Sequence, residues 1–406
     1  MFLPNIPMPT LLDTINLTET SPSTVTTLGA RSVVPIDNRQ LPDHVQRAFD
    51  DPLDYPPLAS ATVPGDRVAI ALQAGVPQLN QILSGTLSAL AHAGVEEEYV
   101  TVVVPPGQEQ LQSELQDELG SRVSIVVHSS DDIEQLAMLG VTEAGEPLRL
   151  NRILCDADLV ISIRPAQGKS SHPMPMEPIF PTFADQESIN RFQTPRHCET
   201  PSQRARLAQE SDRCNALLGL SLSMDVVPGP EGSVAACMCG TPRAVAKRSA
   251  QQYRDIWGYT PSESADLVVA SLGSDPSQQT WHALSRALSV AEELVSANGA
   301  IAICSAIATP PGPALKRLKD TADLSDLENK LKNAHHADSI LARQLCRILQ
   351  QHTVYLASSL KPTTVECLGM APITNEEELG RLIASQNNCL LLDHAHFLQP
   401  KVSEDA

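Results

Sequence analysis

The sequence has few aromatic residues, no excess of positive charge and no long apolar run. Phe, Trp and Tyr make up only 3% of the 406 residues, so the cores must be built mainly from Leu, Val, Ile and Ala. The net charge of −19 argues against a nucleic acid or an anionic membrane as a partner, because either requires a basic face. No run approaches the roughly eighteen apolar residues of a membrane-spanning helix. We therefore expect neither partner, and the sequence leaves the oligomeric state open.

Paired cysteines and a targeting signal are also missing. The nine cysteines are scattered, and Cys237 and Cys239 form C-x-C rather than the C-x-x-C of a zinc or redox pair. This usage is typical of reduced, buried thiols. The N-terminus, MFLPNIPMPT, has neither the basic start nor the apolar core of a signal peptide. These features predict a cytoplasmic protein.

What the sequence does have is a repeated alternation of short apolar runs and amphipathic segments. The runs are rich in β-branched residues and lie at 67–72, 99–104, 122–127, 158–163, 266–271, 300–305, 353–357 and 389–392. Strands that alternate with helices form βαβ units around a largely parallel sheet. The predicted fold class is therefore α/β, with two doubly wound α/β domains and a cleft between them.

A plausible linker at 259–264 interrupts this alternation and sets the predicted domain boundaries. The parts we expect are an irregular N-terminal arm at 1–40, an N-terminal α/β domain at 41–258 and a smaller C-terminal α/β domain at 259–406. The arm is rich in Thr, Ser and Pro, and we expect it to pack back as an edge strand. Two local expectations are a short helix at 132–138 and a helix over 277–298.

The segment after the run at 158–163 carries the first candidate site. Ligands in open α/β sheets bind in loops beyond the carboxyl ends of strands. The polar residues of this segment stand among five prolines and are Arg164, Gln167, Lys169, His172 and Glu177. The alternative is a proline-rich surface loop. Gly168-Lys169-Ser170 is similar to the tail of a phosphate-binding loop, but Ile163 stands where that motif requires its first glycine.

Histidines supply the remaining candidates. His172 and Lys169, with His197 and Cys198 downstream, combine a base, a cation and soft metal ligands, although their spacing fits no closed zinc pattern. The pair His335-His336 falls in a region expected to be helical and is interpreted as part of a solvated face. The pair His394 and His396, close to the C-terminus, is interpreted as a surface feature.

Several segments carry a family resemblance. They are a Pro-Gly-Asp-Arg-Val lead-in at 64–68, an Ala-Gly-Val helix end at 93–95, His128 after a strand, a run at 139–152 similar to LG-T--G-P--VN, the strand at 157–163, and the segment 262–273. Taken in order, they resemble the nickel-pincer lactate racemase (LarA-like) family over most of the chain. The resemblance implies an isomerase fold of two α/β domains around a cleft. It also implies a nickel ion bound by a nicotinic acid derivative on a lysine, with two histidines as acid and base.

The chain departs from the family pattern at the positions that would carry the chemistry. The substrate-binding Asp-x-Thr-Arg-Pro turn is replaced at 72–77, and Pro105-Pro106-Gly107-Gln108 replaces the Gly-Thr-His-Arg turn of the first histidine. The family's second catalytic histidine aligns near Gln167. If a small gap is allowed in the alignment, Lys169 or His172 takes its place. The family's cofactor-bearing lysine aligns near Glu177. The family's nickel-ligand histidine aligns near Gln193, four residues before His197. In the second domain, Arg286 stands where the family has a lysine on a helix.

Three hypotheses follow from the resemblance and these departures. The first is an isomerase-family enzyme that uses Lys169, His172 and Arg286, with His197 as a contributing residue or metal ligand. The second is a non-catalytic relative that binds a small polar or carboxylate ligand, or a partner protein. The third is a pincer enzyme with relocated anchors, such as Lys169. The replaced positions favour a protein that keeps the scaffold and has lost or exchanged the nickel-pincer activity.

Overall fold

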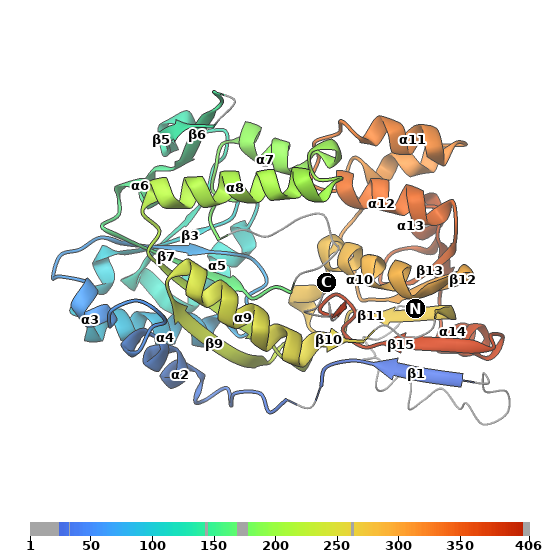
Figure 1. The fold of residues 1–406 in the computed structure, drawn as a ribbon, viewed down its shortest axis with the longest axis horizontal. Helices are drawn as coiled ribbons and strands as arrows, with labels where there is room; N and C mark the ends of the chain where they lie inside the picture. Colours follow the sequence, from blue (N-terminus) through green and yellow to red (C-terminus); the bar gives the residue numbers. More distant parts are fainter. Residues whose placement is uncertain (1–23, 32, 143–144, 169–177, 261–263, 401–406) are drawn as a thin grey trace.

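The computed structural model describes residues 24–31, 33–142, 145–168, 178–260 and 264–400. This part of the chain forms two α/β domains side by side, each built around a six-stranded sheet (Figure 1). The predicted fold class is confirmed. The boundaries at 41–258 and 259–406 stay a prediction.

The first sheet has the strand order β4-β3-β2-β7-β8-β9. Its strands are β2 (Val68–Leu72), β3 (Val100–Val104), β4 (Ser124–Val127), β7 (Leu159–Pro165), β8 (Leu222–Pro228) and β9 (Val234–Gly240). All neighbours are parallel except β8 and β9. The order reverses between β2 and β7, where open sheets of this kind place their ligands.

Both faces of this sheet are covered by helices. In β2, Val68, Ile70 and Leu72 pack in one core with α2 (Leu41–Asp50), α4 (Leu79–His92) and α5 (Glu109–Leu119). Ala69 and Ala71 face the opposite core, because successive side chains of a strand point to opposite faces. That second core includes residues of α6 (Arg152–Asp156), α7 (Gln186–Gln193) and α8 (Pro201–Leu218). The small helix α3 (Leu58–Ala61) and helix α9 (Pro242–Trp257) complete the domain.

An antiparallel hairpin replaces the helix predicted at 132–138. Only Ile133–Gln135 form a 3-10 turn, η3, and its preceding residue Asp132 accepts a hydrogen bond from the Glu134 amide. Strand β5 (Leu136–Val141) follows at once and pairs with β6 (Pro147–Asn151). The prediction was wrong because pairing with a later segment, which a local pattern does not contain, decides the conformation here.

The second sheet is parallel throughout and has the order β1-β15-β11-β12-β13-β14. Its strands are β1 (Thr24–Leu28), β11 (Ala265–Ser271), β12 (Val295–Cys304), β13 (Thr353–Ala357), β14 (Ala371–Ile373) and β15 (Asn388–Leu392). Its helices are α10 (Trp281–Leu294), α11 (Leu324–Leu331), α12 (Ser339–Leu349), α13 (Pro362–Cys367) and α14 (Glu376–Ala384). The helix expected over 277–298 is shorter at both ends, because the Thr280 side chain caps α10 and Val295 already pairs with Ala265 of β11.

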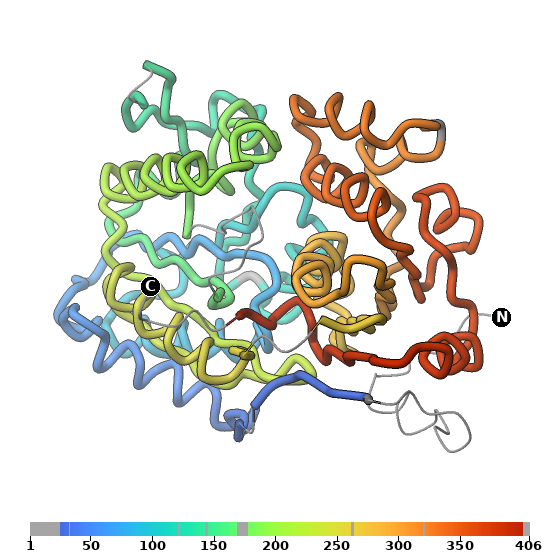
Figure 2. Tube along the Cα trace, turned by 45° about the vertical axis from the view of Figure 1, so that its right-hand side comes forward, coloured from blue at the N-terminus to red at the C-terminus, as the bar shows by residue number. Residues whose placement is uncertain are grey.

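The N-terminal arm returns as an edge strand, as expected. Strand β1 pairs in parallel with β15 of the second sheet, although the segment after it leads into the first domain. Figure 2 shows this segment along the lower side of the molecule, from the second domain to helix α2. The arm thus spans both domains.

The two domains share a continuous apolar core on the side of α9. Val245, Tyr253 and Trp257 of α9 belong to the same buried cluster as residues of β11, α10 and β13. Strand β10 (Gly258–Tyr259) pairs with β16 (Gln399–Pro400), which brings the end of the described chain back to the domain junction. Tyr259, the first residue of the predicted linker, is therefore part of a packed junction.

Two expectations from composition concern thiols and membranes. All nine cysteines have free thiols, and six of them are buried. Burial raises the pKa of the Cys155 thiol, with a further contribution from Asp156, to about 11. Within the described residues, no helix has the length and hydrophobicity to cross a membrane.

Candidate functional site: an interdomain cleft

A cleft of about 880 Å³ lies between the two domains. The first domain lines it with Pro106, after β3, and with helix α7. The second domain lines it with the start of α10, the segment 309–313 after β12, and the segment 335–341 that leads into α12. The lining therefore follows the carboxyl ends of strands from both sheets, the position that parallel α/β folds use for ligands. Its volume suits a small molecule.

Helix α7 presents a row of amide side chains to the cleft. Gln186, Asn190 and Gln193 recur at three- and four-residue spacing, which places them on one face of the helix. Ser130 donates a hydrogen bond to Gln186 Oε1 at 2.7 Å, and Gln186 Nε2 donates to Asn190 Oδ1 at 2.8 Å. These contacts hold Gln186 and Asn190 in place. The sequence reasoning considered only Gln193 among these residues, and only as a replaced position.

The start of α10 forms the opposite wall. Trp281 Nε1 donates to the carbonyl oxygens of Thr309 and Pro310 at 3.1 and 3.2 Å, which ties α10 to the segment after β12. Ser285 Oγ donates to Gln344 Oε1 of α12 at 2.6 Å. The start of α10 is therefore hydrogen-bonded both to the segment after β12 and to α12.

His282 is the titratable group of this wall. Burial, together with the nearby positive charge of Arg286, lowers the pKa of His282 to about 4. At neutral pH its imidazole is therefore uncharged and offers one donor and one acceptor nitrogen. The sequence reasoning missed His282, because nothing in its local pattern marks it as buried beside an arginine.

Two exposed histidines and a buried aspartate complete the outer part of the cleft. His335 and His336 have ring centroids 5.5 Å apart and lie in a loop between α11 and α12, not in a helix. Asp338 is buried, and its carboxylate accepts hydrogen bonds from the amides of Ala314 and Leu315. The expectation that the histidine pair is solvated is confirmed. Asp338 is already engaged by these backbone amides.

The structure places two of the predicted site residues behind or beside the cleft rather than in its lining. Arg286 is buried on α10, and its Nε donates to the carbonyl oxygen of His396 at 2.9 Å. His197 is half-buried in the 3-10 turn η4 (Pro195–His197), where its Nε2 lies 3.2 Å from Nε of Arg196. Burial and the nearby Arg196 and Arg191 lower the pKa of His197.

The other predicted site residues lie in or next to the loop after β7. Gln167 is half-buried and directly precedes Gly168, whose Cα approaches Gln399 and Tyr253 so closely that a Cβ would lie 2.0 Å from Gln399 Oε1. Lys169, His172 and Glu177 lie outside the described residues. Their predicted roles are therefore not tested by the geometry.

The expectation that His394 and His396 lie at the surface is wrong. Each is only 2% exposed, because β15 ends at the junction of the two domains. The Glu231 amide donates to His394 Nε2 at 3.2 Å, and His394 Nδ1 lies 3.0 Å from Asp393 Oδ1. Burial and the neighbouring His394, Arg286 and His282 lower the pKa of His396 well below its usual range.

The turn at 72–77, where the family resemblance would place a substrate-binding arginine, contains the buried side chain of Gln73. Gln73, at the carboxyl end of β2, is 3% exposed, and its Nε2 donates to Pro178 O and Thr182 Oγ1 at 3.1 Å. A buried amide in these contacts does not supply the bidentate guanidinium that a carboxylate prefers. Across the described ranges, no three His, Cys, Asp or Glu side chains converge as metal ligands.

The architecture and the cleft define an α/β protein of two doubly wound domains with a ligand-sized site between them. Residues 15–165 match the lactate racemase N-terminal domain family, a range that includes the strands from β2 to β7. This part of the chain is therefore similar to the lactate racemase N-terminal domain.

Solved structures agree with this assignment of the fold. The lactate racemase apoprotein from Thermoanaerobacterium thermosaccharolyticum is 17% identical, with a TM-score of 0.73 over 93% of this chain and 94% of that one. A protein from Thermotoga maritima is 12% identical, with a TM-score of 0.66 over 91% of this chain and 100% of that one. A search of curated proteins found no match.

Proposed function

We propose that this lactate racemase-like protein binds a small polar ligand in the interdomain cleft and does not perform nickel-pincer racemisation. The observation that carries the proposal is the chemistry of the cleft lining. The polar lining residues contribute amides, hydroxyls, imidazoles, the Trp281 indole and the Asp338 carboxylate, and none of the described lining residues is Lys, Arg, Glu or Cys. Such groups recognise hydroxyl, amide or carboxylate oxygens through hydrogen bonds.

The donor set supports the negative part of the proposal. By the family resemblance, Gln193 stands near the nickel-ligand histidine and the turn at 105–108 replaces the first catalytic histidine. A neutral amide is a poor ligand for nickel compared with imidazole. The described residues therefore do not fit the nickel-pincer group.

Binding to the cleft is tested by isothermal titration with a panel of small 2-hydroxy acids and their uncharged amides. We expect saturable binding by at least one member, and a loss of about tenfold in affinity for Asn190→Ala, because that variant removes a hydrogen bond inside the cleft. Gln110→Ala, which removes an exposed amide on α5 that donates a hydrogen bond to Glu114, is the matched control. No binding by any member, or an equal loss in both variants, would contradict the proposal.

The absence of pincer chemistry is tested separately. The protein is produced together with the enzymes that make the nickel-pincer cofactor, and its intact mass and nickel content are measured. We expect the mass of the unmodified chain and no stoichiometric nickel. A covalent adduct that carries one nickel per chain would instead support a pincer enzyme with relocated anchors.

A further inference from the structure

The two sides of the domain interface are built differently. On the lower side in Figure 1, β1 of the second sheet is joined to helix α2 of the first domain, and α9 packs against residues of the second domain. On the upper side, Glu199, just before α8, contacts Arg343 of α12, and Arg196 of η4 contacts Asn333, which lies before α12. The cleft is lined by α7 on one side and by α10 and the lead-in to α12 on the other.

Three kinds of contact join the upper side. Arg343 Nη1 of α12 lies 2.6 Å from Glu199 Oε1 of the first domain. The Arg196 amide donates to Lys332 O at 3.0 Å, and Arg196 Nη1 donates to Asn333 Oδ1 at 3.2 Å. Ile340, at the start of α12, is buried in the apolar cluster of the first domain that contains Phe192 and Cys198. All three contacts would be lost if the domains moved apart on this side.

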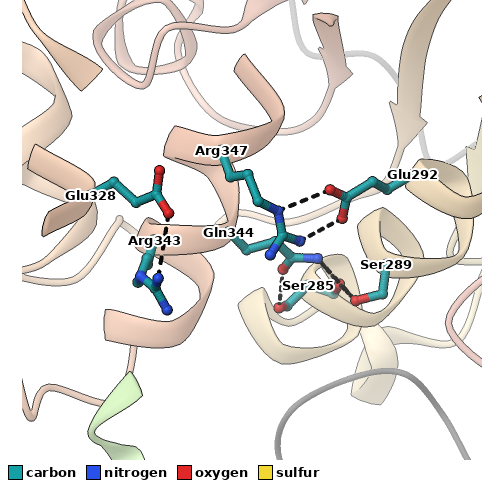
Figure 3. A network of polar contacts seen from close by, with 7 residues as sticks. All are labelled: Ser285, Ser289, Glu292, Glu328, Arg343, Gln344 and Arg347. Carbon is teal, nitrogen blue, oxygen red and sulfur yellow. Dashed lines mark hydrogen bonds and ion pairs between the residues drawn. The ribbon is translucent and has the colours of Figure 1, made fainter. Parts of the chain in front are cut away.

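The ion pair between Arg343 and Glu199 is partly shielded from solvent. The two side chains are 21% and 28% exposed, whereas Arg347, one turn further along α12, is 51% exposed. Arg347 makes a two-point contact with Glu292 of α10, inside the second domain (Figure 3). Arg343 also lies 3.4 Å from Glu328 of α11, so α12 carries one ion pair that crosses the interface and two that stay within the second domain.

We propose that Arg343, Glu199, Arg196 and Ile340 form a latch that holds the cleft closed, with the junction around α9 and β1 as the hinge. Opening the latch separates α7 from α10 and widens the cleft between them. Rigid-body closure about one packed side is a common way to admit and enclose a ligand. The inference rests on the proposed function only in taking this cleft as the site that is gated.

The latch is tested by neutralising one partner at a time. The Arg196 amide is a direct reporter, because its hydrogen bond to Lys332 O crosses the interface. We expect Glu199→Gln to raise hydrogen–deuterium exchange at the Arg196 amide roughly fivefold, the scale of a weakened ion pair. Raising the salt concentration should speed exchange in the natural protein and have less effect in the variant, because salt screens ion pairs.

Glu292→Gln is the matched control, since it makes the same change of charge in a pair that stays within the second domain. It should leave exchange at Arg196 unchanged. Equal exchange in Glu199→Gln and the natural protein, or an equal rise in the Glu292→Gln control, would overturn the latch. The readout needs no ligand, so increased exchange in Glu199→Gln without any binding in the titration would keep the latch and reject the proposed function.

Discussion

At the scale of single residues, the surroundings of His282 determine its chemistry. Burial and the charge of Arg286 lower its pKa to about 4, so the folded protein keeps an uncharged imidazole in the cleft wall. Arg286 itself is held by the carbonyl oxygen of His396. The sequence analysis placed Arg286 in the site. In the structure, Arg286 lowers the pKa of His282, a residue that the sequence analysis did not single out.

His282 should make the protein less stable in mild acid. Its pKa is about 4 in the folded protein and about 6.5 in the unfolded chain, so the unfolded chain takes up the proton first as the pH falls. The contribution to stability is fully present above pH 6.5 and decreases between pH 6.5 and 4, by about 2 kcal/mol at pH 5. Urea unfolding at pH 7 and pH 5 measures it, and His282→Gln should show a smaller loss. An identical loss in the variant would show that other groups cause the pH dependence.

At the scale of elements, the contact between α2 and α4 depends on one glycine. A Cβ on Gly85 would lie 2.6 Å from both Pro42 O and Val45 Cβ of α2. These distances are shorter than any ordinary contact, and one involves backbone. Glycine inside a helix normally reduces stability, so its presence here reflects the close approach of the two helices.

Gly85→Ala should therefore destabilise the first domain although alanine is the better helix former. The gain in helix propensity is about 1 kcal/mol, and overpacking of a core typically costs about 1–3 kcal/mol, so we expect a net loss of roughly 1 kcal/mol. Thermal and urea unfolding measure the change. Ser84→Ala, the preceding and exposed residue of α4, is the control and should be neutral or slightly stabilising. A stabilised Gly85→Ala variant would mean that α2 moves away at little cost.

At the scale of the whole molecule, α9 joins the two domains. Trp257 at its end is fully buried, its Nε1 donates to Pro228 O at 2.8 Å, and its ring lies 5.0 Å from that of Phe397. Pro228 belongs to the first sheet, whereas Phe397 follows the last strand of the second sheet. One side chain thus packs against parts of both domains.

Trp257→Ala should destabilise the protein and uncouple its domains. Removing a buried tryptophan costs about 3–5 kcal/mol, and the loss falls on the contact that both domains share. We expect urea unfolding followed by circular dichroism to change from one transition to two. Trp281→Ala, which removes the other tryptophan of the chain, is the matched control and should retain a single transition. A single, merely weaker transition in Trp257→Ala would contradict the coupling.

The sequence by itself determined the class of fold and most of the elements. Strand β13 begins and ends at the residues that the pattern predicted, because the hydrophobic period of a strand is a local property. The alternation of strands and helices likewise predicted two parallel α/β domains.

Tertiary structure alone decided the site and the pairings. The segment at 136–141 is a strand because β6 lies beside it, and His394 and His396 are buried because β15 ends where the domains meet. The cleft brings α7 together with α10 and the residues before α12, which are about a hundred residues or more apart in the chain. Burial and contacts between distant residues depend on the whole packed chain, so no local pattern contains them.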